Sequence, residues 1–417
     1  MDIILGAGAT GLSYAAMSNQ DYIILEASSS IGGYCKTVKQ DGFVWDYSGH
    51  FFHFRDQAMK EMVMRHMSDE DILTCRKKTQ ILYRERYIDF PFQKNIHQLE
   101  QQEFIDCLYD LFCLTGTAYD NFKGMLYSKF GPSIAEKFLI PYNEKLYACD
   151  LNSLDLDAMG RFFPYADKEE IVHNFKENSN HSYNDTFIYP RGGAIEYINS
   201  LARSVSSDRI HLNEAAIKID PEARTVSTAK GSYQYDHLIS TIPLPQLLAR
   251  CNLPYEPSTY SWNKVLVFNL GFDRPSPESF NNWVYFPGKE SVFYRVGFYD
   301  RIFNDPRMSL YVEIGYPANA TIDIVATKAR VLRDLEAVGI ISGHKLISAC
   351  HILMDPAYVH ISTKSLNDVV KQKERLAQHG IYSIGRYGSW TYCSIEDGML
   401  EARELSHQLN KRYHIKI

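Results

Sequence analysis

Apolar and polar positions in the first part of the chain alternate with the spacing of short strands and helices. Residues 1–55 open with an apolar strand, continue into a helical segment and reach a second apolar strand, YIILEA, which is the order of a β-α-β unit. Residues 57–67 have helical spacing, and the segment ILYRERYIDF predicts a hairpin that turns at Arg84 and Glu85. The pattern therefore predicts an α/β region at the N-terminus.

The pattern is mostly helical over residues 96–180 and strand-like afterwards. Apolar residues recur at spacings of three and four in the runs EFIDCLYDLFCL, AYDNFKGMLYSKF and SIAEKFLIPYNEKLY. A strand, a turn and a helix are predicted over 187–205, and residues 264–315 contain alternating runs that are typical of an antiparallel sheet. We interpret the helical block as an insertion and the later strands as a second layer.

The end of the chain returns to alternating strands and helices. We predict a helix over 322–337, a strand over 345–353 and a helix over 366–378. The segment IYSIGRYGSWTY and a terminal helix over 395–411 follow. This pattern predicts that the N-terminal α/β unit is completed by the last strand and helix of the chain.

A glycine motif lies between the first strand and the first helix. Gly6, Gly8 and Gly11 have the spacing GxGxxG, and Glu26 ends the second strand. In such a motif the first glycine permits a tight turn, the second lets the backbone approach a pyrophosphate, and the third lets the helix pack on the strand. The helix N-terminus attracts phosphates, and the carboxylate can bind a ribose. GxGxxG alone is weak evidence, but in this strand-helix-strand context it predicts a dinucleotide site.

The residues after Glu26 favour FAD over NAD. Gly32 and Gly33 form a pair of the kind that flavoproteins with two dinucleotide-binding folds commonly carry at this place, although an ordinary turn also explains it. Gly49 and His50 follow in DGFVWDYSGHFFHF, where a backbone segment has room to pass close to an isoalloxazine ring. We therefore predict non-covalent FAD, because no Cys or His lies in an obvious flavinylation motif.

These inferences combine into one fold prediction. The chain is expected to have an α/β fold: a discontinuous Rossmann-like FAD-binding domain with an inserted helical domain and an antiparallel β-sheet substrate domain. The predicted limits are 1–95, 186–245 and 346–417 for the FAD-binding domain, 96–185 for the helical domain and 246–345 for the substrate domain. A chain of 417 residues exceeds one ordinary core, which agrees with several domains.

Composition and charge argue against several classes of partner. The formal net charge of −6 gives no electrostatic reason to expect nucleic acid or an anionic membrane. No apolar run approaches the roughly 18–20 residues of a spanning helix. Met1 leads directly into a strand, so we expect no signal peptide and a cytoplasmic location. The eight cysteines lack CxxC or metal-ligand spacing, which predicts reduced thiols and no metal site.

Several blocks along the chain carry a more specific pattern. GAGATGL, GFVWDYSGH, FPFQKNIH, IPYNEKLYA, NDTFIYPRGG, NWVYFP, FYRV and GRYGSWTY occur in this order. With these residues the chain resembles the UDP-galactopyranose mutase family, nearest its eukaryotic-type members, within the superfamily of amine oxidases and protoporphyrinogen oxidase. The glycine motif marks only that superfamily, whereas the ordered set FPFQ, PYN, FYR and GRYGSW is far more specific.

The resemblance implies an FAD-dependent isomerase that interconverts the pyranose and furanose forms of a nucleotide-sugar, expected to be UDP-linked. Reduced FAD would supply a nucleophile, its N5 atom, to the anomeric carbon of the sugar. NAD(P)H is a candidate reductant. The protein would supply orientation and charge stabilisation. This agrees with the sequence, which contains no GxSxG, no HExxH and no obvious pair of catalytic carboxylates.

The resemblance also implies substrate-binding roles for individual residues. Arg161 and Arg295 match the arginines that bind the substrate diphosphate, for which a guanidinium is well suited. The alternative for each is a surface ion pair. Tyr358 and Tyr392 match tyrosines on the same diphosphate, with core packing as their alternative. The other matched substrate positions are Phe90, Gln93, Asn143, Tyr147, Asn184 and Tyr285.

The resemblance further implies a set of cofactor contacts. His50 matches a histidine beside the flavin, and with Arg161 and Arg295 it forms the predicted catalytic set. The backbone of residues 394–396 is expected to cap the pyrimidine end of the flavin with the last helix, although a plain helix N-cap also explains it. The complete set of expected FAD contacts is Gly6, Gly8, Thr10, Gly11, Glu26, Gly33, Tyr34, Gly49, His50, Ala216, Arg386, Ser394, Ile395 and Glu396.

The chain departs from the family pattern near the nucleotide and the sugar. Phe90 stands where the pattern has Tyr, so one hydroxyl near the uracil is lost, and Tyr147 stands where Trp is usual. Val359 and His360 replace prolines after Tyr358. These departures leave the flavin chemistry in place and leave the identity of the nucleotide-sugar open.

Two other functions stay open at this level. A redox enzyme of the amine oxidase or porphyrinogen oxidase type would oxidise its substrate and would have little use for two diphosphate-binding arginines. The other open hypothesis is a flavin- or nucleotide-binding protein without turnover. The sugar, the base, the reductant and the oligomeric state are not determined by the sequence.

Overall fold

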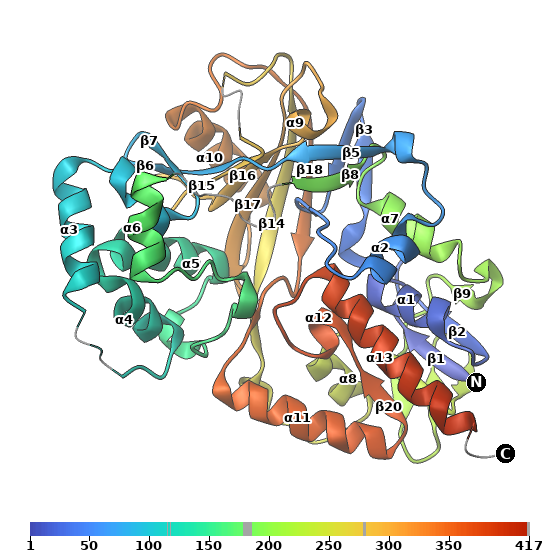
Figure 1. The fold of residues 1–417 in the computed structure, drawn as a ribbon. Helices are drawn as coiled ribbons and strands as arrows, with labels where there is room; N and C mark the ends of the chain where they lie inside the picture. Colours follow the sequence, from blue (N-terminus) through green and yellow to red (C-terminus); the bar gives the residue numbers. More distant parts are fainter. Residues whose placement is uncertain (115, 117, 178–185, 278–280, 415–417) are drawn as a thin grey trace.

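The structure of the chain is a computed structural model that describes residues 1–114, 116, 118–177, 186–277 and 281–414. Figure 1 shows three parts side by side: a parallel sheet with both chain ends, a large sheet in the middle, and a helical block on its far side. Among the described helices, none combines the length and the apolar character that crossing a membrane requires. The predicted mixed α/β fold is confirmed.

The parallel sheet has the strand order β20-β13-β1-β2-β9 (Figure 1). Its strands are β1 (Asp2–Leu5), β2 (Tyr22–Leu25), β9 (Ile210–His211), β13 (His237–Ser240) and β20 (Ile381–Ser383). The central β1 is buried along its whole length because helices cover both faces of such a sheet. Helix α1 (Ala9–Met17) packs between α7 (Ile195–Ala202) and the C-terminal α13 (Ile395–His414). The prediction that the last strand and helix complete this unit is confirmed.

The large sheet has the order β18-β14-β17-β16-β15-β6-β7, and β19 pairs with β14. Its strands are β6 (Thr79–Tyr83), β7 (Arg86–Asp89), β14 (Ser261–Phe272), β15 (Trp283–Tyr285), β16 (Arg295–Phe298), β17 (Ser309–Pro317), β18 (Leu346–Met354) and β19 (Val359–His360). The pairings are antiparallel as predicted, except that β15 runs parallel to β6. The hairpin predicted at Arg84 and Glu85 is confirmed, and both turn residues have positive φ, 47° and 66°.

Strand pairing crosses the predicted domain limits at two places. β6 and β7 lie within 1–95, and β18 lies within 346–417, yet all three strands hydrogen-bond into the large sheet. Strand pairing depends on packing against cross-strand neighbours, and the local sequence does not specify which partner a strand finds. The predicted limits themselves stay a prediction.

The helical block is close to its prediction. It contains α3 (Gln101–Phe112), α4 (Phe122–Ile134), a π-helical turn (Ala135–Leu139), α5 (Ile140–Tyr147) and α6 (Lys168–Lys176). Asp167 begins α6 with a reciprocal capping box, in which its side chain and that of Glu170 bind each other's backbone N–H. Aromatic residues such as Phe92 and Phe138, whose rings stack at 5.2 Å, fill the core of the block. Helix α5 packs against β17 and so joins the block to the large sheet.

Smaller elements connect these parts. The antiparallel pairs are β3 (Thr37–Gln40) with β4 (Phe43–Asp46), β5 (Ile72–Arg76) with β8 (Thr186–Pro190), and the set β10 (Lys218–Asp220), β11 (Thr225–Ser227) and β12 (Ser232–Gln234). The other helices are α2 (Gln57–Met64), α8 (Leu244–Arg250), α9 (Asp300–Phe303), α10 (Ile324–Ala337), α11 (Thr363–Gln378) and α12 (Gly385–Gly388). The sequence pattern missed β3, β4 and β5 because each is short and pairs within a hairpin or with a distant strand.

Candidate functional site

The glycine motif has the geometry that a pyrophosphate cradle requires. A Cβ on Gly6, whose φ is +102°, would lie 2.4 Å from Thr241 Oγ1, and one on Gly11 would lie 2.1 Å from the Gly6 carbonyl oxygen. Apart from its neighbours in the chain, no described atom lies within 4 Å of a Cβ placed on Gly8, so open space remains there beside the N-terminus of α1. Gly33 borders that space, because its Cβ would lie 3.7 Å from Gly8 Cα. These residues therefore fit a bound dinucleotide.

Glu26 and Ala216 lie at the carboxyl edge of the parallel sheet. Glu26 is buried, and its carboxylate accepts hydrogen bonds of 2.8 Å from the N–H groups of Ala7 and Ser28. The carbonyl of Glu26 accepts a 2.8 Å bond from the N–H of Glu214, which brings the segment of Ala216 to the same edge. The carbonyl of Ala216 accepts from Arg250 Nε at 2.8 Å. The two residues thus lie at the same edge of the sheet, and their role as FAD contacts stays a prediction.

Thr10 and Tyr34 border the C-terminal elements. Cβ atoms placed on Gly385 and Gly398 would lie 2.9 and 2.5 Å from Thr10 Oγ1, so α12 and α13 come close to the start of α1. The hydroxyl of Tyr34 accepts a 3.0 Å bond from the N–H of Asp355, and burial raises the pKa of Tyr34 to about 12. Its role as an FAD contact stays a prediction.

The N-terminus of α13 is capped and tethered. Asp397 accepts bonds of 2.8 Å from the N–H and hydroxyl of Ser394, while Ser394 Oγ accepts from the N–H of Asp397 at 3.1 Å. Glu396 is buried and accepts from the N–H groups of Arg55 and Asp56 at 2.6 and 2.8 Å. The plain N-cap reading is therefore correct for the side chains. The proposed contact of the backbone at Ser394, Ile395 and Glu396 with a flavin stays a prediction.

His50 is held in one protonation state. Its Nδ1 lies 2.9 Å from the Ser48 carbonyl oxygen, and because a carbonyl only accepts, Nδ1 carries the hydrogen. Burial lowers the pKa of His50 to about 4, so the ring is neutral near pH 7 and Nε2 is unprotonated. A Cβ on the preceding Gly49 would lie 2.4 Å from the Tyr311 hydroxyl, which explains why glycine is needed there.

Arg295 points into the protein and forms a buried ion pair. It lies on β16 opposite Glu313 on β17, and its Nη2 lies 2.8 Å from Glu313 Oε1 while Nε bonds to the second carboxylate oxygen. The side chains of Arg295 and Glu313 are 18% and 1% exposed. Glu313 also accepts a hydrogen bond from the Ser48 hydroxyl. The alternative considered for Arg295, an ion pair at the surface, is therefore wrong. Arg295 does form an ion pair, but the pair is buried.

Tyrosines surround these charges. The rings of Tyr358 and Tyr392 stack at 5.7 Å with an interplanar angle of 15°, and the Arg386 guanidinium lies 5.3 and 4.9 Å from their centroids. Arg295 lies 5.9 and 6.0 Å from the rings of Tyr294 and Tyr311. The pKa of Tyr358 is raised, because the effect of burial outweighs the opposing effect of the Arg295 and Arg386 charges. We call the residues Tyr285, Tyr294, Arg295, Tyr311, Glu313 and Tyr358 the inner wall.

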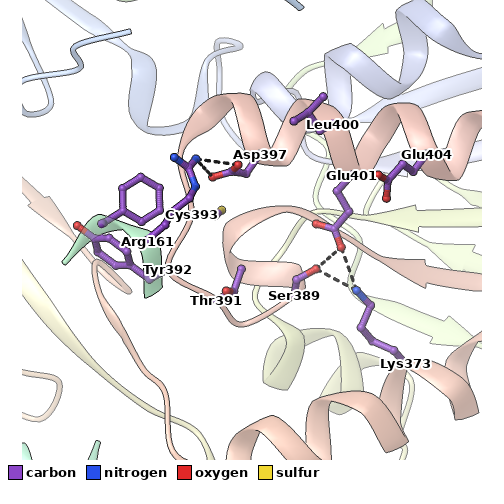
Figure 2. A pocket seen from close by; sticks show the side chains of 11 residues that line it. Arg161, Lys373, Ser389, Thr391, Tyr392, Cys393, Asp397, Leu400, Glu401 and Glu404 are labelled. Carbon is purple, nitrogen blue, oxygen red and sulfur yellow. Dashed lines mark hydrogen bonds and ion pairs between the residues drawn. The ribbon is translucent and has the colours of Figure 1, made fainter. Parts of the chain in front are cut away.

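Arg161 approaches from the helical block. It lies in a short 3-10 helix (Gly160–Phe162), and its Nη2 lies 2.8 and 2.7 Å from the two carboxylate oxygens of Asp397 (Figure 2). The ring of Phe162 contacts Tyr392 edge-on at 5.1 Å. We call Arg161, Phe162, Tyr392 and Asp397 the mouth. All four line a cavity of about 620 Å³, and Figure 2 shows Arg161, Tyr392 and Asp397 on one side of it.

The residues predicted to bind the nucleoside lie between the helical block and the inner wall. Phe90 lies 5.3 Å from the ring of Tyr285. Gln93 and Asn143 are buried, and each donates its amide to a backbone carbonyl, of Pro164 and of Leu139. Neither amide oxygen has a hydrogen-bond partner among the described residues, and both oxygens are buried. Asn184 lies outside the described residues.

Tyr147 and His360, two residues at which the sequence departs from the mutase pattern, contact each other. His360 Nε2 lies 2.9 Å from the carbonyl oxygen of Tyr147, and the two rings lie 6.2 Å apart. Tyr147 also meets Tyr358 edge-on at 5.9 Å. A histidine can bind this carbonyl, whereas a proline has no donor to offer. The two residues are therefore in direct contact, and Tyr147 links them to Tyr358.

Sequence reasoning missed several residues of the site. Glu313, Tyr294 and Tyr311 are buried beside Arg295, and the partly buried Tyr142 meets Tyr285 edge-on. A signal for Glu313 existed, because it is an isolated acid within the apolar strand SLYVEIGY, and buried carboxylates are nearly always paired. Among the described residues, His, Cys, Asp and Glu side chains form no cluster of three or more that could hold a metal ion.

Comparison with known proteins identifies the family. The profile of the flavin-containing amine oxidoreductases matches residues 8–347, and the chain therefore belongs to this family. Membership implies FAD as the cofactor, which the open cradle at Gly8 fits.

Solved structures share the fold over nearly the whole chain. A crystal structure of reduced UDP-galactopyranose mutase is 24% identical, has a TM-score of 0.92, and is matched over 98% of this chain and 93% of that one. A protein from Exiguobacterium sp. 255-15, provisionally described as a protoporphyrinogen oxidase, is 16% identical with a TM-score of 0.80 and coverage of 99% and 98%. Putrescine oxidase bound to putrescine is 14% identical with a TM-score of 0.68 and coverage of 98% and 98%. These likenesses establish the fold, not the reaction.

Proposed function

We propose that this protein is an FAD-dependent mutase that interconverts the pyranose and furanose forms of a nucleotide-sugar, with UDP as the expected nucleotide. The observation that carries the proposal is the inward-facing Arg295, 18% exposed and set among tyrosines. A guanidinium among phenolic hydroxyls suits the oxygens of a diphosphate. Reduced FAD, when bound, supplies the nucleophile for the anomeric carbon.

The inner wall has the groups that a departing diphosphate needs. Negative charge grows on the diphosphate as its bond to the sugar breaks, and Arg295 would stabilise that charge most in the transition state. Glu313 holds the Nε edge of Arg295 and so leaves the other edge of the guanidinium to face a ligand. Burial raises the pKa of Tyr358 and of Tyr392, so both hydroxyls keep their protons and can donate to phosphate oxygens.

The nucleoside end of the substrate would lie in the helical block. The amide oxygens of Gln93 and Asn143 have no hydrogen-bond partner among the described residues but are buried, so a donor such as a base N–H would reach them only after neighbouring side chains moved. Phe90 and Tyr285 offer aromatic faces nearby. This end would hold the nucleoside while the inner wall holds the diphosphate, and binding at such non-reacting parts of a substrate can support catalysis.

A second candidate is an oxidase of the amine oxidase or protoporphyrinogen oxidase type. The family membership and the shared fold with putrescine oxidase favour it. Against an amine oxidase stands the positive charge of Arg386 beside Tyr358 and Tyr392, which would repel a protonated amine, whereas the charge of Arg295 is balanced by Glu313.

One experiment separates the two. The dithionite-reduced protein is incubated without oxygen with UDP-galactose and related nucleotide-sugars, and the products are resolved by chromatography. The mutase predicts a furanose product with no stoichiometric consumption of reductant. Hydrogen peroxide formed one-for-one with product under air, without a furanose, would instead identify the oxidase.

A further inference from the structure

Arg161 is held by a partner that resembles the ligand it is expected to bind. Two oxygens of one carboxylate, that of Asp397, lie 2.8 and 2.7 Å from Arg161 Nη2 (Figure 2). Ser394 Oγ lies 3.3 Å from the same nitrogen. A carboxylate and a phosphate offer a guanidinium the same kind of acceptor. The ion pair joins the helical block to the first turn of α13.

The pair lies where exchange of partners is easy. The side chains of Arg161 and Asp397 are 34% and 25% exposed, and an ion pair of this exposure contributes little to stability. Asp397 stays satisfied without Arg161, because it also accepts from Ser394 and from Arg55 Nη2 at 3.1 Å. Phe162 contacts Tyr392, so the guanidinium is anchored beside a residue of the proposed diphosphate site.

We propose that Asp397 is an internal competitor that occupies Arg161 until a nucleoside diphosphate takes its place. The proposal rests on the proposed function and deepens it: Asp397 sets the affinity of the mouth for the diphosphate group. The Arg161–Asp397 contact breaks as phosphate oxygens bind Arg161, while Arg55 and Ser394 keep the carboxylate at the start of α13.

The chain offers a matched control. Glu404 lies on the same helix and lines the same cavity, and it is exposed. Glu404→Gln removes the same charge as Asp397→Asn without touching Arg161. Asn at position 397 keeps an oxygen that can accept from Ser394, so the helix cap is retained. Unfolding temperature and FAD content of each variant report whether the fold is intact.

The test is the affinity of the FAD-loaded protein for UDP and for inorganic pyrophosphate, measured by titration calorimetry. We expect Asp397→Asn to lower both Kd values about two- to fivefold, the range that an exposed ion pair provides. Glu404→Gln should change them much less. Arg161→Ala should weaken binding, and Arg161→Ala with Asp397→Asn should bind no better than Arg161→Ala alone.

The outcomes separate this inference from the proposed function. Weaker or equal binding by Asp397→Asn, an equal gain from Glu404→Gln, a gain that survives removal of Arg161, or failure of both probes to bind would overturn it. Tighter binding of pyrophosphate without turnover of any nucleotide-sugar would support the competitor and reject the mutase. Turnover of a nucleotide-sugar together with unchanged binding by Asp397→Asn would support the mutase and reject the competitor.

Discussion

The two arginines expected to bind a diphosphate are both paired with carboxylates, but their surroundings differ. Arg295 and Glu313 are 18% and 1% exposed and are enclosed by tyrosines, whereas Arg161 and Asp397 are 34% and 25% exposed at the mouth. Breaking a buried pair leaves an uncompensated charge, while an exposed pair is exchanged with solvent at little cost. The same chemical pairing is therefore a fixed support on the inner wall and an exchangeable contact at the mouth.

The largest difference should appear when each arginine is removed. We expect Arg295→Ala to lower kcat/KM by about 2–4 kcal/mol, comparable to losing one preorganised oxyanion donor. Arg295→Lys should restore only part of the activity, because an ammonium lacks the planar fork. Steady-state kinetics with a nucleotide-sugar measures both effects. Full activity in Arg295→Ala would remove the best argument for a diphosphate substrate.

Stability should separate the two carboxylates. Glu313→Gln leaves Arg295 buried without its counter-charge, so we expect the free energy of unfolding to fall by about 2–3 kcal/mol, as for a charged group left poorly satisfied. Asp397→Asn should change it by less than about 1 kcal/mol. Denaturant unfolding of the two variants side by side makes the comparison. Equal losses would mean that burial does not distinguish the pairs.

Removal of the exposed arginine should have a smaller and salt-sensitive effect. We expect Arg161→Ala to cost about 1 kcal/mol in the binding of UDP, since its charge is partly solvated and already paired. Raising the salt concentration should reduce the difference from wild type, because exposed charges are screened. The corresponding difference for Arg295→Ala should persist in high salt. Titrations at two ionic strengths decide this point.

A pH dependence of stability should be confined to the inner side of the site, at His50. Burial lowers the pKa of His50 from 6.5 to about 4. Between these two pH values the unfolded chain binds a proton at His50 that the folded protein does not bind. The contribution of His50 to stability is therefore complete above pH 6.5, is lost as the pH falls toward 4, and is constant below. Unfolding of wild type and His50→Gln across this range isolates the effect, and parallel curves would contradict it.

The mouth should not titrate in the same range. Although partial burial raises it, hydrogen bonds from Ser394 and Arg161 hold the pKa of Asp397 below its usual range, so the Arg161–Asp397 pair stays charged above pH 4. The pH curves of Asp397→Asn and wild type should therefore run parallel there. This provides the control for the His50 experiment.

Much of the fold could be predicted from the sequence because its signals are local. The motif of Gly6, Gly8 and Gly11 specifies a turn through the space around each glycine, and the structure shows that space directly. The helical block follows from apolar spacing, and the hairpin at Arg84 and Glu85 follows from the strands that flank it. Each signal depends on residues close together in the chain.

The candidate site could be predicted only in part. The sequence alone provided the glycine cradle, the buried strands and the order of the helical and strand-rich regions, since periodicity and turn chemistry act over a few residues. Only the tertiary structure decided that Arg295 faces inward onto Glu313, that Arg161 meets Asp397, and that β6, β7 and β18 join the large sheet. These pairings join residues far apart in the chain, and burial sets the strength of each, which no local pattern records.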